Sequence, residues 1–252
     1  MEFEAATIKV APLPDTTRGW SVGFSGGPGS RDPPLFTGQN VPLSMMVTEA
    51  YDIPFFLLDA AGWASDTRFN LTAKVPPGAT RAQLREMLQN LLADRFHLKA
   101  HRGPKEMSVF AIVLARGGPK FKSGGQPVAP TESSGPKPMK YDEQGFPLLE
   151  RPGFIGQGNK VRMWLASSTL DNLGLQICGE LGRPVVNATG LDGEYDLRLY
   201  WVQDYNHTGV DPQLGPSLEN ALQAQLGLRL EARKRELQVL FLDSADRLPT
   251  DN

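Results

Sequence analysis

The segment GFSGG (23–27) is the first place where the residue types could support catalysis. It sets Ser25 between glycines, as in the nucleophile elbow of serine hydrolases, but that elbow needs a helix after the serine and Pro28 disfavours one. Trypsin-like proteases carry Asp where this chain has Phe24, and their histidine precedes the serine, whereas the first histidine here is His97. We interpret the segment as a glycine-rich loop, with Ser25 a nucleophile only if the chain is a hydrolase.

Two groups of ionisable residues have spacings that resemble metal sites. His97 and His101 lie four apart, but on a predicted strand their α-carbons would be about 13 Å apart, too far to share one ion. Asp192, Glu194 and Asp196 alternate around a predicted turn without the ligand pattern of a calcium loop. We expect no metal site, and the absence of phosphate-binding and dinucleotide-binding motifs predicts no cofactor.

Aromatic side chains are the remaining candidates for contact with a ligand. Trp63 lies in a predicted connection between a helix and a strand, where it can fill the core or face a ligand, and core filling is the favoured interpretation. Tyr51 and Trp201 are the other two candidate binding residues. The only cysteine, Cys178, falls on the apolar face of a predicted helix, so we interpret it as a core residue.

The elements that position these residues are marked by a pattern of apolar residues, and this pattern occurs twice, about 130 residues apart. In each copy a capped helix is followed by alternating apolar residues. The alternating positions of the last strand match in pairs: Met107 with Leu237, Val109 with Val239, and Ala111 with Phe241. Such self-similarity predicts a duplicated supersecondary unit, a kind of unit that usually serves assembly or binding.

The predicted fold class is α+β, with two related units, each a small mixed or antiparallel sheet covered on one face by two helices. Residues 1–116 are expected to form the first unit, with an N-terminal strand and a long loop at 11–40. Residues 117–158 are rich in Gly and Pro and predict a linker or extended loop. Residues 159–252 are expected to form the second unit.

Local signals predict where the main elements begin and end. Thr80 caps a helix from about 81 to 93, and the second unit has a helix capped by Ser167 or Ser168. RGPK (102–105) predicts a tight turn between two strands, and a hairpin is expected after the last helix.

Composition excludes some classes of partner. The chain has 252 residues, 26 Lys plus Arg against 28 Asp plus Glu, and a formal net charge of -2, so we expect no nucleic-acid partner. No apolar run approaches the roughly 18 residues that span a bilayer, and no export leader precedes the first predicted strand. Met1 can stand in place of a removed leader, so the missing leader does not indicate the cellular compartment of the protein.

Several segments resemble landmarks of a soil-bacterial secreted family of unknown function. They are FEAATIK (3–9), LLADRFHL (91–98), GRPVV (182–186), TGLDGEYD (189–196) and LGLRLE (226–231). Members of that family typically carry an export leader, and the domain also occurs fused to membrane metallopeptidases of the antirepressor type. The resemblance implies a secreted or periplasmic protein and supplies no catalytic residues. The element order of each half is also similar to the short N-terminal domains of secretins and TonB-dependent receptors, which are protein-contact modules.

These observations favour an extracytoplasmic binding or sensory module for a peptide, glycan or partner protein, without catalysis. The alternative is a secreted hydrolase whose site is built from loops, with Ser25 or an Asp192/Asp196 pair involved. A third hypothesis is purely structural, in which exposed sheet edges pair with another chain.

Overall fold

The computed structural model describes residues 1–12, 21–124, 138–204 and 209–250, which fold as two compact units. Unit 1 consists of Met1–Lys105 and Glu236–Asn252, and unit 2 consists of Glu106–Arg235. The division predicted from the sequence places all of residues 159–252 in the second unit. It differs from the structural division, in which Glu236–Asn252 belong to unit 1. In the structure, each unit takes in the end of a long strand whose beginning belongs to the other unit.

Unit 1 is built on a four-stranded antiparallel sheet. Its strand order is β1-β5-β3-β2, with the bounds Ala5–Val10, Arg68–Lys74, Leu35–Pro42 and Gly23–Gly26. Helices α1 (Leu43–Tyr51) and α2 (Arg81–Phe96) pack with it into one hydrophobic core. Two short helical turns, Phe55–Leu57 and Gly62–Ser65, flank the two-residue strand β4 (Leu58–Asp59).

Helix α2 forms where the sequence predicts it, because both of its ends carry strong local signals. The Thr80 hydroxyl accepts from the Gln83 backbone N–H at 3.2 Å, and the Gln83 side chain accepts from the Thr80 N–H at 2.8 Å, a complete capping box. The helix ends at His97, which adopts a left-handed conformation with φ of 47°. His97 is therefore a helix cap, and its expected place on a strand is wrong.

Unit 2 has a second four-stranded antiparallel sheet. Its strand order is β7-β11-β9-β8, with the bounds Lys122–Ser123, Tyr195–Val202, Lys160–Ser168 and Gly153–Gln157. Helix α3 (Leu170–Leu181) is capped by Thr169, whose hydroxyl accepts from the Asn172 N–H, and not by Ser167 or Ser168. Helix α4 (Leu218–Ala221) continues into a π-helical turn, Leu222–Leu226.

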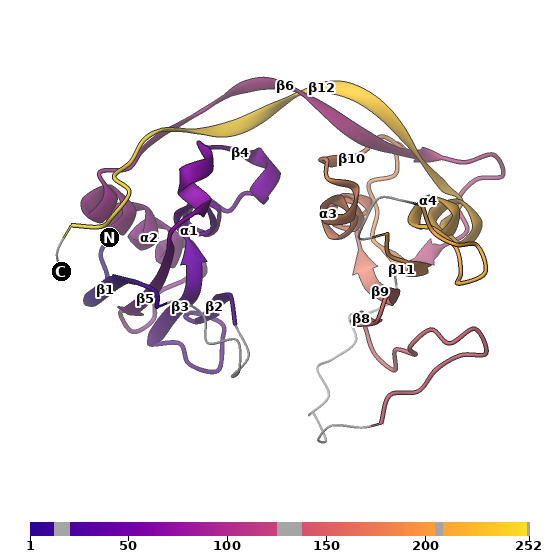
Figure 1. The fold of residues 1–252 in the computed structure, drawn as a ribbon, viewed down its shortest axis with the longest axis horizontal. Helices are drawn as coiled ribbons and strands as arrows, with labels where there is room; N and C mark the ends of the chain where they lie inside the picture. Colours follow the sequence, from indigo (N-terminus) through magenta and orange to yellow (C-terminus); the bar gives the residue numbers. More distant parts are fainter. Residues whose placement is uncertain (13–20, 125–137, 205–208, 251–252) are drawn as a thin grey trace. The chain divides into compact units, whose positions relative to one another are not determined.

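Two long strands replace the expected hairpins. Strands β6 (Lys99–Leu114) and β12 (Leu228–Ser244) are neighbours in a third sheet, of order β10-β6-β12-β4, where β10 is Val185–Asn187 (Figure 1). The outer pairs are parallel: β10 with β6 in unit 2, and β4 with β12 in unit 1. The predicted turn at 102–105 is absent, and Gly103 instead allows close packing, since a Cβ there would lie 3.1 Å from the Phe241 ring.

The two units share one order of elements. Each runs strand, helix, short strand, strand, helix, long strand, and the two antiparallel sheets have corresponding strand orders. Left-handed residues also correspond. Asn40 and Ser167, with φ of 51° and 49°, each stand three residues before a helix and beside a register shift. His97 and Gly227, with φ of 47° and 66°, each end the second helix of their unit.

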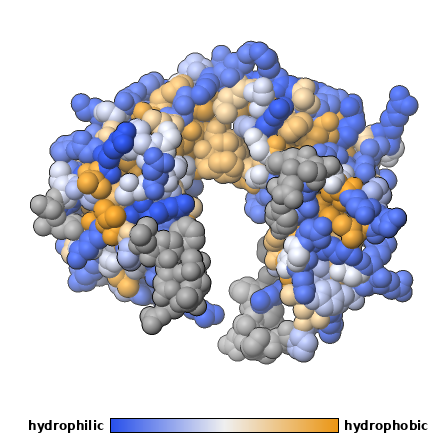
Figure 2. Space-filling view, in the orientation of Figure 1, coloured by the Kyte–Doolittle hydropathy of each residue, from blue (hydrophilic) through white to orange (hydrophobic). Residues whose placement is uncertain are grey.

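The expected loop at 11–40 is partly regular structure. Strand β2 and the beginning of β3 lie in it, while residues 13–20 fall outside the described part of the chain. The tight connection between these strands depends on Gly26, where φ is 80° and a Cβ would lie 1.9 Å from the Leu35 carbonyl oxygen. The face drawn in Figure 2 is mostly hydrophilic, with smaller hydrophobic areas on each unit. No described helix has the length and apolar character needed to cross a membrane.

Candidate functional site

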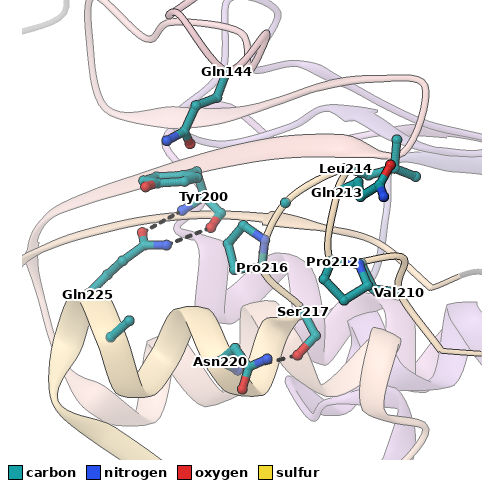
Figure 3. Close-up of a pocket in the computed structure, with 12 residues that line it drawn as sticks. Gln144, Tyr200, Val210, Pro212, Gln213, Leu214, Pro216, Ser217, Asn220 and Gln225 are labelled. Carbon is teal, nitrogen blue, oxygen red and sulfur yellow. Dashed lines mark hydrogen bonds between the residues drawn. The ribbon is translucent and has the colours of Figure 1, made fainter.

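A pocket of about 620 Å³ opens on unit 2, between the end of strand β11 and the start of helix α4 (Figure 3). It is wide enough for a small ligand, since binding sites of that kind have volumes of about 300–1,000 Å³. Its lining combines side-chain amides and hydroxyls with prolines and aliphatic groups. The lining residues are Gln144, Tyr200, Val210, Pro212, Gln213, Leu214, Gly215, Pro216, Ser217, Asn220, Ala224 and Gln225.

The connection 203–217 supplies most of the lining of this pocket through its residues 210–217. It joins β11 to α4 with fifteen residues, whereas the corresponding connection in unit 1, residues 75–80 between β5 and α2, has six. The Pro216 carbonyl accepts from the Val202 N–H at 2.9 Å, which fixes the end of the connection against the strand. The Ser217 hydroxyl accepts from the Asn220 N–H at 3.3 Å and caps α4. The longer connection is thus anchored where it meets α4.

Gln225 ties the π-helical turn to the edge of strand β11. Its side-chain amide donates to the Tyr200 carbonyl at 2.8 Å and accepts from the Tyr200 N–H at 3.0 Å (Figure 3). A side chain therefore satisfies both backbone groups of Tyr200 at this edge. π-Helical turns are rare and occur frequently at functional sites.

The segment around Phe146 covers the outer face of β9 and β11 beside the pocket. Phe146 is fully buried, and its ring centroid lies 5.0 Å from that of Tyr200. The Asp142 carboxylate accepts from the Phe146 N–H at 2.9 Å and pairs with Arg162, whose Nε donates to the Pro147 carbonyl at 2.8 Å. Lys160 donates to the Gln144 carbonyl. These charged contacts hold Gln144 at the rim of the pocket.

The described lining of the pocket carries no charged side chain. Among the described residues that line it there is no Asp, Glu, His, Lys, Arg or Cys, and Tyr200 is the one ionisable residue. These residues include no thiol, imidazole or carboxyl group for nucleophilic or acid–base chemistry. They can offer hydrogen bonds to an uncharged polar molecule.

Two of the three predicted binding residues lie in unit 1. Tyr51 and Trp63 are both half-buried and pack against the same core. The Arg247 guanidinium lies 5.7 Å from the centre of the Trp63 ring. Burial raises the pKa of the Tyr51 phenol, and the positive charge of Arg102 opposes that rise. These contacts indicate that the Tyr51 and Trp63 side chains pack against the core of unit 1 and keep one edge exposed.

Trp201 lies in the core of unit 2, with 2% of its surface exposed. Its indole N–H donates to the Glu180 carboxylate at 2.7 Å, and burial raises the pKa of Glu180. A ligand outside the protein cannot reach this ring. Strand alternation puts its neighbour Tyr200 on the opposite face, toward the pocket. Trp201 is a binding residue predicted from the sequence, whereas Tyr200, which lines the pocket, is not.

The residues considered for catalysis are dispersed. The Ser25 hydroxyl lies on β2, 2.7 Å from the Thr37 hydroxyl, with no histidine or carboxylate bonded to it in the described chain. Glu194 accepts from the Ser167 hydroxyl at 2.7 Å, and Asp196 accepts from the Trp164 indole N–H at 2.6 Å. Asp196 also pairs with the Arg198 guanidinium at 3.2 Å. The structure therefore brings no nucleophile, base and acid together around Ser25 or the Asp192/Asp196 pair.

The histidines and the cysteine also have other partners. His97 and His101 each place Nδ1 against an aspartate, at 2.7 Å from Asp246 and 2.8 Å from Asp243. No cluster of three metal-ligating side chains occurs in the part of the chain that the structure describes, and His207 lies outside it. Cys178 is 3% exposed, and burial raises the pKa of its thiol.

A family model matches residues 44–245, which contain the antiparallel strands β9 and β11, the pocket and both long strands. The chain belongs to this family, DUF3738, described as a protein of unknown function. No curated protein and no solved structure matches the chain. The match covers all of unit 2 and, in unit 1, residues 44–105 and 236–245, so the pocket of this DUF3738 protein lies within the family domain.

Proposed function

We propose that this DUF3738 protein is a non-catalytic binding module whose ligand, an uncharged polar molecule, occupies the pocket of unit 2. The observation that carries this proposal is the neutral lining, with hydrogen-bonding groups and no ionisable residue other than Tyr200 among the described ones. A charged ligand would lose its hydration there without gaining a counter-charge.

The correspondence between the units supports the location of the site. We propose that the two units are copies of one ancestral unit, because their element order and left-handed positions agree. Unit 2 then differs from unit 1 in the length of the connection 203–217, whose residues 210–217 line the pocket. Elements that the copies share maintain the fold, and an added segment that forms a cavity serves a role of its own.

We propose an extracytoplasmic setting for this module, with the pocket as its sensory or binding element. The resemblance to a family whose members carry export leaders supports the setting. The fusion of that domain to antirepressor-type metallopeptidases supports a sensory role. Expression from the native gene with its upstream region, followed by cell fractionation, tests this part: recovery of the protein in the cytoplasmic fraction alone would contradict it.

The binding function itself can be tested by mapping ligands on the isotopically labelled full chain. Neutral sugars, neutral peptides and charged analogues of both are added in turn, and amide chemical shifts are followed. We expect neutral compounds to shift resonances of residues 210–217 and 220–225, and charged ones to leave them unchanged. Binding of charged compounds in the pocket would refute the proposal. Hydrolysis of an ester, peptide or glycoside substrate that is lost in Ser25→Ala would refute the absence of catalysis.

A further inference from the structure

The side-chain amides of the pocket are available to a ligand. Within the described residues, those of Gln144, Gln213 and Asn220 make no hydrogen bond, although the backbone N–H groups of Gln213 and Asn220 are bonded to Asp211 and Ser217. Each amide offers two donors and one acceptor group. A ligand that both donates and accepts at several neighbouring positions matches such a set, and hydroxyl groups do both.

Four apolar residues of the connection between β11 and α4 also line the pocket. Val210, Pro212, Leu214 and Pro216 alternate with Asp211, Gln213 and Gly215 along the chain, and Leu214 is 44% exposed. The pocket therefore presents carbon surfaces beside amide groups. A saccharide ring has this combination, since its faces carry C–H groups and its edge carries hydroxyls.

The edge of β11 argues against a peptide as the ligand. A peptide that adds to a sheet needs free backbone groups on the edge strand. Here the Gln225 amide occupies both backbone groups of Tyr200, and the Pro216 carbonyl accepts from the Val202 N–H. The pocket also lacks, among its described lining residues, a charge that would bind a peptide terminus.

We propose that the pocket of unit 2 binds a short neutral saccharide through the amides of Gln144, Gln213 and Asn220. This inference rests on the proposed function and names the chemical class of its ligand. The saccharide contacts the apolar side chains of Val210, Pro212, Leu214 and Pro216 with its ring faces. Gln225 positions the π-helical turn and does not contact the saccharide through its amide, which is already bonded at both ends.

Calorimetric titration of the full chain with three sets of compounds tests the ligand class. The sets are neutral mono- and disaccharides, the corresponding uronic acids, and neutral capped peptides. The variants Gln213→Leu and Asn220→Leu each remove one free amide, and Gln223→Leu removes an exposed amide outside the pocket as a matched control. We expect binding of a neutral saccharide that weakens about 3- to 10-fold in each pocket variant, the effect of one hydrogen bond, and stays unchanged in Gln223→Leu.

The outcomes separate this inference from the proposed function. Binding of peptides, weakened by Gln213→Leu, would overturn the saccharide assignment and leave the binding function standing. Preference for the uronic acids would overturn both, because it contradicts a neutral site. Saccharide binding that Gln213→Leu and Asn220→Leu leave unchanged would overturn the assignment of these amides. Failure of every set to bind at millimolar concentration would overturn both the saccharide and the pocket as a binding site.

Discussion

The division of the long strands between the units makes a prediction about where a mutation acts. Leu240 lies on β12, which begins in unit 2, but its side chain is 1% exposed and belongs to the core of unit 1. Ile112 lies on β6, which begins in unit 1, and is fully buried in unit 2. We predict that Leu240→Ala destabilises unit 1 and that Ile112→Ala destabilises unit 2.

The expected size follows from the burial of these side chains. Leu→Ala or Ile→Ala removes three carbon atoms, and at about 0.8 kcal/mol for each buried group the transfer term alone is about 2.4 kcal/mol. The cavity that remains raises the total to about 3–5 kcal/mol at a site that cannot collapse. A loss of about 3 kcal/mol increases the population of the open state about a hundredfold, at about 1.4 kcal/mol for each tenfold change.

Amide hydrogen exchange of the full chain, read by mass spectrometry, measures this effect in each unit. In Leu240→Ala, peptides from α1 and α2 should lose protection about a hundredfold, while those from α3 and β11 keep it; Ile112→Ala should do the reverse. Gln238→Ala and Ser108→Ala, at exposed positions on the same strands, are the controls and should change little. Equal loss in both units, or loss in the opposite unit, would refute the assignment of the strand ends.

Three further predictions concern single residues. Burial raises the pKa of Glu180 in the folded state, so the folded protein binds this proton more tightly than the unfolded chain does. The stabilisation that results is complete below the unfolded pKa of about 4.3 and is lost as pH rises through the folded pKa. Glu180→Gln keeps an acceptor for Trp201, so urea unfolding should show the variant gaining stability relative to the parent between pH 4 and pH 7, and an equal difference at both pH values would contradict this. Gly26→Ala should destabilise unit 1 by about 1–3 kcal/mol, because φ is 80° and a Cβ would meet backbone. Gly29→Ala, with φ of 82° but open space, isolates the strain, and similar losses in both variants would show that the contact has no effect. Thr80→Ala should cost about 1 kcal/mol in thermal unfolding by removing the cap of α2, and an unchanged midpoint would contradict that role.

Elements set by local chemistry could be predicted from the sequence. The capping box at Thr80 and the apolar spacing of α2 fix that helix without reference to the rest of the chain, and its apolar residues are buried as expected. Strand β11 follows the same reasoning, since Leu197, Leu199 and Trp201 alternate into the core. Period and caps are properties of neighbouring residues, so the sequence carries them directly.

Pairings between distant segments could not be predicted in this way. The turn signal at 102–105 is real as a local preference, but β6 continues through it because its partner, β12, lies far away in the sequence. Gly103, which suggests a turn in the sequence, instead leaves space for the Phe241 ring to pack against the strand. Tertiary pairing therefore overrides the local signal, and the two expected hairpins become two long strands.

The candidate site escaped prediction because its residues are individually ordinary amides, prolines and a tyrosine, which come from strand β11, helix α4, the π-helical turn, the segment around Phe146 and the connection before α4. The informative signal is a difference in length between corresponding parts of the two units, residues 75–80 and 203–217. That difference becomes visible only when the two units are compared element by element. The corresponding left-handed residues, such as Asn40 and Ser167, are required by the backbone geometry of the fold. A connection more than twice as long as its counterpart is not required by that geometry, and its residues 210–217 supply most of the lining of the candidate pocket.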